Sequence, residues 1–285
     1  MKKILITVMV LASILFLMDS CMQFRMTQTE IAEHFVKKKI KGTQDFYSVG
    51  NRKIHFAKTG LNDDAVVLFV HGSPGSLSDF IQFLADTTLQ QMATLLSVDR
   101  PGFGQSNFGR GEQSLKVQAE MIKPLLDKYK HDKPLILVGH SLGGPVIARL
   151  AIDYPDLIDG LIFVAASVSP ELEPPNWWRA PFATAYFRWM VPRSIRASND
   201  EIYALKSELK EMLPLWKNIK AKVMVIQGTK DSLVPAANAE FIRNQLINAT
   251  PKMIYEEGMD HFVPWSHPHL IKNAVMEMVG ELKKN

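Results

Sequence analysis

Residues 135–144 read Leu-Ile-Leu-Val-Gly-His-Ser-Leu-Gly-Gly, an apolar run that leads into a serine with glycine two positions away on either side. An apolar run of this length is typical of a buried strand, and Gly-X-Ser-X-Gly between a strand and a helix is typical of a sharp turn that projects the serine hydroxyl. Glycine suits both flanking positions because neighbouring backbones pass close to such a turn. The same residues can also form a packing turn without chemistry, and the remaining sequence decides between the two.

Strand and helix patterns alternate on both sides of this turn. Strands are expected at 45–49, 53–58, 66–70, 94–98, 135–138, 161–164, 223–226 and 252–255, and helices near 29–40, 78–92, 113–130, 144–154, 235–247 and 267–283. This alternation predicts an α/β fold with a mostly parallel eight-stranded sheet flanked by helices. The first two strands have no helix between them, which predicts an antiparallel hairpin at the edge of the sheet.

One interval, residues 169–219, has no strand pattern and is rich in aromatic residues. We expect a short helical cap here, inserted after the sixth strand and placed over the carboxyl ends of the strands, where α/β folds bind ligands. Its aromatic side chains either form the core of the cap or line an apolar substrate pocket. The candidates for the pocket are Trp177, Trp178, Phe182, Tyr186, Phe187 and Trp189.

The first 21 residues have the pattern of an export signal. Lys2 and Lys3 precede the fifteen uncharged residues Ile4–Met18, a stretch shorter than the ~20 residues needed to span a bilayer. Cys21, the single cysteine, excludes an intramolecular disulfide.

The stretch Leu-Met-Asp-Ser-Cys at 17–21 resembles a bacterial lipobox. That resemblance implies that Cys21 is lipidated and becomes the mature N-terminus, although Met18 and Asp19 depart from the usual pattern. An uncleaved N-terminal anchor and a released secreted protein remain open. All three alternatives place the folded domain outside the cytoplasm, and the first two attach it to a membrane.

The rest of the chain divides into three parts. Residues 22–44 form a tether with an amphipathic helix that Thr27 and Glu30 start as a capping box, residues 45–168 and 220–285 form the core, and residues 169–219 form the cap. The net charge of +4 is too small to indicate a nucleic-acid partner.

A serine hydroxyl is a weak nucleophile that needs a base, and the base needs an acid to orient it. When the serine sits on a strand-to-helix turn, the acid and then the histidine follow later in the chain, each just after a strand. Asp231 follows the strand at 223–226, and His261 follows the strand at 252–255. Asp260 also neighbours His261, but adjacent residues rarely orient each other's side chains, so Asp231 is favoured.

The reaction also requires donors for a developing oxyanion. The backbone N–H of Leu142 lies at the start of a helix and is one candidate. His-Gly-Ser-Pro-Gly at 71–75 follows the strand at 66–70, and the N–H of Ser73 in this loop is the second candidate. We expect structural roles for three neighbours, with His140 packing beside the turn and Asp99 and Arg100 forming an ion pair that pins a loop.

Over residues 45–283 the chain resembles a capped α/β-hydrolase. Besides the serine turn and the loop at 71–75, three segments carry the resemblance: Asp-Arg-Pro-Gly-Phe-Gly-Gln-Ser at 99–106, Gly-Thr-Lys-Asp at 228–231 and Asp-His-Phe at 260–262. The resemblance implies that Ser141 is the nucleophile, His261 the general base and Asp231 its orienting acid. It implies no cofactor and no metal. His267 and His269 have no carboxylate or cysteine cluster near them in sequence, so we expect both to be exposed to solvent.

The residue at the turn limits the chemistry. Haloalkane dehalogenases and epoxide hydrolases resemble this scaffold but carry an aspartate where this chain has Ser141. Prolyl iminopeptidases have a larger, acidic cap. A small-molecule carboxylic ester or thioester is therefore the expected substrate. Hydrolysis of a carbon–carbon bond, cofactor-free perhydrolysis, and a non-catalytic ligand-binding lipoprotein remain open.

Overall fold

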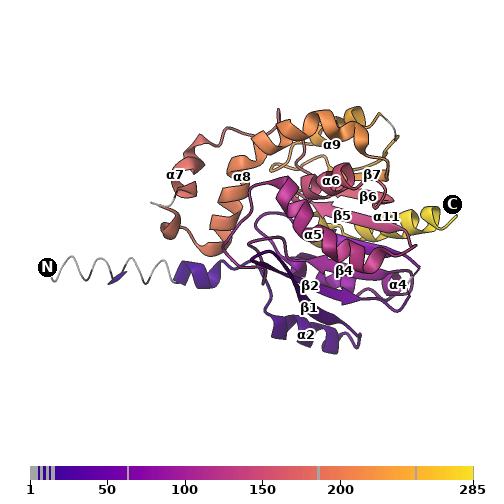
Figure 1. Cartoon of the computed structure of the whole chain (residues 1–285), viewed down its shortest axis with the longest axis horizontal. Helices are drawn as coiled ribbons and strands as arrows, with labels where there is room; N and C mark the ends of the chain where they lie inside the picture. Colours follow the sequence, from indigo (N-terminus) through magenta and orange to yellow (C-terminus); the bar gives the residue numbers. More distant parts are fainter. Residues whose placement is uncertain are drawn as a thin grey trace.

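The computed structural model describes residues 6, 9, 10, 13, 17–62, 64–184, 187–247 and 249–284, and its centre is one eight-stranded sheet (Figure 1). The strand order is β1-β2-β4-β3-β5-β6-β7-β8. Neighbouring strands from β4 to β8 pair in parallel, whereas β1 pairs antiparallel with β2, and β2 with β4. This confirms the predicted sheet and its edge hairpin. The strands are β1 Thr43–Val49, β2 Arg52–Thr59, β3 Val66–Val70, β4 Thr94–Val98, β5 Leu135–His140, β6 Gly160–Val164, β7 Lys222–Gly228 and β8 Lys252–Glu256.

Helices cover both faces of the sheet (Figure 1). Side chains alternate between the faces of a strand, so in β3 Val66 and Leu68 join one apolar cluster and Val67 and Phe69 join the other. Burial on both sides explains the continuous apolar runs in the sequence. The helices outside the insertion are α2 Gln28–Lys37, α3 Ile81–Leu84, α4 Thr87–Gln90, α5 Leu115–Lys130, α6 Gly143–Asp153, α9 Ala237–Gln245, α10 Val263–Ser266 and α11 Pro268–Leu282, with a 3₁₀ helix η1 at Leu77–Phe80.

The structure adds detail to the sequence prediction in two regions. The single helix expected near 78–92 is three short pieces, because Asp86 accepts the N–H groups of Thr88 and Leu89 and starts a new helix there. The capping box of α2 is confirmed, and Phe35 of this helix is buried against the sheet. The expected signal segment falls largely on residues outside the described ranges.

The insertion lies between β6 and β7, as predicted, and its described residues contain no strand. Its long helix, α8, covers Arg193–Met212. The shorter pieces are η2 Trp177–Arg179, α7 Ala180–Ala183, η3 Arg188–Met190 and η4 Leu213–Asn218.

The sheet order determines where the chemistry can occur. β3, β5, β7 and β8 run in the same direction, so the loops that follow them meet at one edge of the sheet. These are the loops that carry Ser73, Ser141, Asp231 and His261.

Candidate active site

Ser141 lies on the sharp turn between β5 and α6, where the sequence predicted it. Its φ of +53° is in the left-handed region that residues with a side chain rarely adopt. A Cβ on Gly139 would lie 2.5 Å from the carbonyl oxygen of Gly143, and a Cβ on Gly143 would lie 2.2 Å from that of Val70. Only glycine therefore fits at these two positions, and the close packing around them holds Ser141 in its strained conformation.

His261 and Asp231 are joined by a hydrogen bond, in which the Nδ1–H of the ring donates to Oδ2 of the carboxylate at 2.8 Å. Asp231 also accepts the backbone N–H groups of Leu233 at 3.0 Å and Val234 at 2.7 Å. Burial opposes the ionisation of Asp231, but these hydrogen bonds outweigh it and lower the pKa of the carboxyl. The contact orients the ring so that Nε2 is left as its proton acceptor.

Asp260, the competing acid, makes different contacts. Its Oδ1 accepts the backbone N–H of Phe262 at 2.9 Å and the hydroxyl of Ser266 at 3.4 Å. Asp260 therefore holds the turn that leads into α10, and the hydrogen bonds favour Asp231 as the partner of His261.

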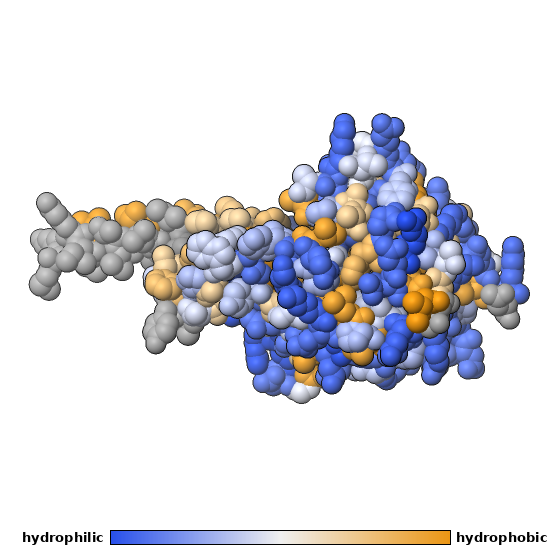
Figure 2. Space-filling view, turned by 90° about the horizontal axis from the view of Figure 1, so that it is seen from above, coloured by the Kyte–Doolittle hydropathy of each residue, from blue (hydrophilic) through white to orange (hydrophobic). Residues whose placement is uncertain are grey.

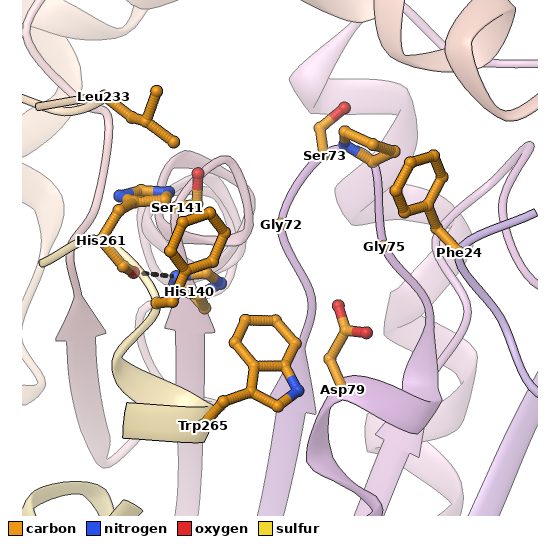
Figure 3. A pocket seen from close by; sticks show the side chains of 12 residues that line it. Phe24, Gly72, Ser73, Gly75, Asp79, His140, Ser141, Leu233, His261 and Trp265 are labelled. Atoms are coloured by element: carbon orange, nitrogen blue, oxygen red, sulfur yellow. Dashed lines mark hydrogen bonds between the residues drawn. The ribbon is translucent and has the colours of Figure 1, made fainter. Parts of the chain in front are cut away.

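Ser141 and His261 line the same cavity, which has a volume of about 580 Å³. Figure 3 shows the Ser141 hydroxyl beside the His261 ring. Among the described residues no hydrogen bond joins the two side chains, and such a contact is often long before a substrate binds. A second cavity, of about 250 Å³, lies on the side of the insertion and reaches Ser141 and His261 as well.

The two predicted oxyanion donors lie on either side of the nucleophile. A Cβ on Gly72 would lie 2.9 Å from Cβ of Ser141, so the loop that carries Ser73 packs directly against the turn. Among the backbone hydrogen bonds of the described residues, none uses the N–H of Ser73 or of Leu142. The Ser73 hydroxyl donates to that of Ser198 on α8 at 2.9 Å, which ties this loop to the insertion.

Arg100 supports the same loop, and its contacts correct the expected ion pair with Asp99. Its guanidinium donates to the carbonyl oxygens of His71 at 2.9 Å and Gly72 at 2.7 Å. It also forms a two-pronged ion pair with Glu201 of α8, with contacts of 2.6 and 2.9 Å, and both side chains are buried. Asp99 instead contacts His55, with 2.7 Å between its Oδ2 and Nδ1 of the ring. The buried guanidinium of Arg100 therefore connects the insertion to the loop beside Ser141.

His140 packs beside the turn as expected, and it has a second role that the sequence did not reveal. Its Nε2–H donates to the backbone carbonyl oxygen of His261 at 2.9 Å. Burial and the nearby His261 lower the pKa of His140 to about 4, so its ring is neutral at pH 7. His140 therefore positions the backbone of His261 as a neutral donor.

Asp79 was also missed by sequence reasoning. Its side chain lines the larger cavity, and Figure 3 shows the carboxyl between Gly75 and Trp265. A Cβ on Gly75 would lie 2.4 Å from Oδ2 of Asp79, so glycine makes room for this carboxyl. Burial, with a smaller contribution from Asp99, raises the pKa of Asp79 to about 7. Serine at 76 followed by an acid at 79 is a capping box in the sequence, which could have located this carboxyl but not its pKa.

Replacing Asp79 with asparagine should stabilise the protein above neutral pH. The pKa of Asp79 is about 7 in the folded chain, above the usual value of 3.8 for this group. Between these two values the folded chain keeps the proton that the unfolded chain loses, so the free energy of unfolding falls as the pH rises from about 4 to about 7. We expect Asp79→Asn to raise the free energy of unfolding by about 2 to 4 kcal/mol at about pH 8 and by less than half as much at about pH 5. Urea unfolding at both pH values tests this, with the exposed Asp156→Asn as the control. A gain in the free energy of unfolding that is the same at both pH values would contradict the raised pKa of Asp79.

The aromatic residues of the insertion do not line the two cavities described above. Neither cavity beside Ser141 is lined by Trp177, Trp178, Phe182, Phe187 or Trp189, and these side chains are 37–78% exposed. Tyr186 lies outside the described residues. The larger cavity is instead lined by aromatic residues from outside the insertion, namely Phe24, Phe262 and Trp265. These two cavities therefore do not support the pocket assignment of the five described residues, and that assignment stays a prediction.

Comparisons with known proteins agree with this architecture. The family model of the alpha/beta hydrolase fold matches residues 65–198. The dihydrolipoyllysine-residue acetyltransferase component of the acetoin cleaving system of Cupriavidus necator is 25% identical over 225 residues, which are 68% of this chain and 59% of that protein. A 2-hydroxy-6-oxononadienedioate/2-hydroxy-6-oxononatrienedioate hydrolase of a Pseudomonas species is 30% identical over 116 residues, 40% of each protein.

The matched region spans less than two thirds of the length of either of these curated relatives. Among solved structures, a membrane phospholipase A described as a bacterial virulence factor superposes with a TM-score of 0.66 at 18% identity, over 98% of this chain and 99% of that chain. The sheet order, the strand-to-helix turn and these matches agree, and the chain has the α/β-hydrolase fold.

Proposed function

We propose that this protein is a serine hydrolase that cleaves carboxylic esters or thioesters through an acyl-enzyme on Ser141. The observation that carries the proposal is the 2.8 Å hydrogen bond between Asp231 and His261, whose ring lines the same cavity as the strained Ser141. The three groups supply a nucleophile, a base and an acid that orients the base.

In the proposed reaction, Ser141 Oγ attacks the substrate carbonyl while its proton passes to Nε2 of His261. The N–H groups of Ser73 and Leu142 stabilise the oxyanion that forms. The carbon–oxygen or carbon–sulfur bond then breaks, and the leaving alcohol or thiol takes the proton from His261. A water molecule, deprotonated by His261, attacks the acyl group and releases a carboxylic acid, and the proton returns to Ser141.

The cavity lining supports an ester rather than a carbon–carbon substrate. One curated relative is named for a dicarboxylate substrate, and cleavage of a carbon–carbon bond is the second candidate function for that reason. The described lining of the larger cavity contains Asp79 but no lysine or arginine, so it offers nothing to pair with a carboxylate there, and in the smaller cavity the one cation, Arg179, lies in the same lining as Glu173. The two cavities that meet at Ser141 give separate spaces for the acyl and leaving groups.

A fluorophosphonate probe tests the proposal directly, because it labels a serine only where a base and an oxyanion site activate it. We expect labelling of the native protein at Ser141, no labelling after heat denaturation, and turnover of p-nitrophenyl esters. An unlabelled folded protein that turns over no ester would instead support the non-catalytic ligand-binding alternative.

We further propose that the domain is exported and held at a membrane through its N-terminal segment. Fifteen uncharged residues after two lysines support export, and Cys21 is exposed, as a lipidation site must be. Among the described residues, no helix combines the length and apolarity needed to cross a bilayer.

Lipidation at Cys21 can be tested with labelled palmitate. We expect the wild type to incorporate the label and Cys21→Ala to lose it, because the thiol is the single acylation site of this type in the chain. Equal labelling of both proteins would exclude Cys21 as the lipid site. A wild type that is unlabelled but remains with the membrane fraction would indicate the uncleaved anchor.

A further inference from the structure

The exposed apolar side chains of the insertion form a surface that the proposed chemistry does not use. We call this surface the cap face and define it by five side chains: Trp177, Trp178, Phe187, Trp189 and Met190. Trp177 is 78% exposed and Trp189 is 64% exposed, although tryptophan is usually well buried. Several large exposed apolar residues close together in sequence indicate a surface that binds something.

The charges around the cap face indicate a lipid surface as the partner. Residues 174–199 contain four arginines and no aspartate or glutamate. Two of the four have carboxylate partners, because Arg188 pairs with Asp200 at 2.6 Å and Arg193 with Asp19 at 2.8 Å. The guanidinium of Arg179 lies over the ring of Trp178, 4.3 Å from its centroid, so cationic and aromatic groups share this surface. Tryptophan and arginine together are typical of the interface between a bilayer and water, where the ring enters the headgroup region and the cation meets anionic lipids.

The N-terminal segment reaches the fold at this same place. Asp19 accepts the backbone N–H of Arg193 at 2.6 Å and pairs with its guanidinium at 2.8 Å. The hydroxyl of Ser194 donates to the carbonyl oxygen of Met22. These contacts join residues 19–22 to the start of α8, three residues after the cap face ends, and Figure 1 shows the short helical turn that precedes Met22 at the same end of the molecule as α7. Figure 2 shows this end from above.

This placement holds for either form of attachment. An uncleaved segment would enter the bilayer beside Asp19, and the acyl chains of a lipidated Cys21 would enter it next to Met22. In both cases the bilayer begins beside the cap face.

The same segment continues from the membrane attachment to the active site. Phe24, three residues after Cys21, lines the larger cavity. The mouth of this cavity also carries Leu233, Phe262 and Trp265, which are 51–61% exposed. A substrate leaving the bilayer would therefore meet apolar side chains as it approaches Ser141.

We propose that the cap face docks on the lipid bilayer that holds the N-terminal segment, and that Ser141 acts on ester lipids taken from that bilayer. The second half of this statement rests on the proposed hydrolase function. The first half rests instead on the proposed membrane attachment, so the two halves can fail separately.

The docking is tested by fluorescence quenching in vesicles of phosphatidylethanolamine and phosphatidylglycerol that contain lipids brominated high on the acyl chain. The full-length chain is reconstituted as Ser141→Ala so that the lipids stay intact. We expect strong quenching of its tryptophan fluorescence, and much less when Trp177, Trp178 and Trp189 are all replaced by phenylalanine. Of the two tryptophans that remain, Trp216 is buried in the core and Trp265 lies on α10 outside the cap face. Equal fractional quenching of the two proteins overturns the proposal, as does a dimer that depends on these tryptophans.

The substrate is tested by comparing two reactions of the otherwise wild-type chain in the same vesicles without bromine. We expect Trp177→Gln/Trp189→Gln to retain the hydrolysis of soluble p-nitrophenyl butyrate within about twofold and to lose about tenfold or more of the hydrolysis of vesicle lipid. The anchor holds both proteins on the vesicle, so this loss reports orientation rather than binding.

The matched control is Leu61→Gln/Ile247→Gln. It removes two apolar residues that are 69% and 72% exposed and precede β3 and β8, at the opposite edge of the sheet from Ser141. Unchanged lipid hydrolysis in the tryptophan variant overturns the proposal, as does an equal loss in the control. If the tryptophan variant also loses the soluble reaction, the quenching result decides. A wild type that hydrolyses neither substrate refutes the hydrolase function, and quenching still tests the docking.

Discussion

Replacing Ser141 with alanine should lower kcat/KM for a p-nitrophenyl ester by about 10⁴-fold or more, because no acyl-enzyme can form without the hydroxyl. We expect losses of similar size for His261→Ala and Asp231→Asn. The asparagine would leave His261 without a carboxylate on Nδ1, and the ring would no longer be held in the tautomer that accepts the serine proton. Steady-state kinetics with circular dichroism as a check on folding measures these effects.

Asp260→Asn is the control for this series. Asp260 caps the turn before α10, so its replacement should change kcat/KM by about threefold at most. A loss on the scale of Asp231→Asn would reassign the acid. Non-additivity is a further check, since a Ser141→Ala/His261→Ala double variant should be no worse than Ser141→Ala alone if the residues act as one unit.

Glu201→Ala should lower the free energy of unfolding by about 3 to 5 kcal/mol, because it leaves the buried guanidinium of Arg100 without its counter-charge. We also expect kcat to fall more than KM changes, since Arg100 holds the carbonyl oxygens of His71 and Gly72 beside the oxyanion donor Ser73. Urea unfolding and steady-state kinetics on the same preparation measure the two effects.

Glu211→Ala provides the comparison on the same helix. Glu211 lies on the exposed side of α8, so its replacement should change the free energy of unfolding by less than about 0.5 kcal/mol. If Glu201→Ala also costs less than about 1 kcal/mol, the ion pair does not hold the insertion to the core as described.

Much of the fold and the reactive groups were predictable because their signals are local. The central strands are continuous apolar runs, since both faces of the sheet are covered, and each run ends at a loop with recognisable residues. Ser141, Asp231 and His261 each follow a strand, so the order of the strands was enough to propose that their side chains meet. The fragmentation of the helix near 78–92 was harder to predict, because it depends on the single cap at Asp86.

The remaining features depend on contacts between distant parts of the chain. Arg100 and Glu201 are 101 positions apart in the sequence, and the residues around each of them do not indicate which residue it will pair with. The aromatic residues of the insertion showed the same difficulty. Their identity predicted apolar contacts, but whether these face a pocket or the outside depends on how the pieces around α7 fold, which no local pattern reveals.

The ion pair between Arg100 and Glu201 has a consequence for how such proteins can diversify. A different insertion between β6 and β7 would change which substrates reach the nucleophile, and a graft of residues 169–219 from another enzyme is the obvious route to a new specificity. In this chain the graft would also remove Glu201, the counter-ion for an arginine that belongs to the recipient. A successful transplant must therefore bring an acid to that position on α8 or replace Arg100 at the same time.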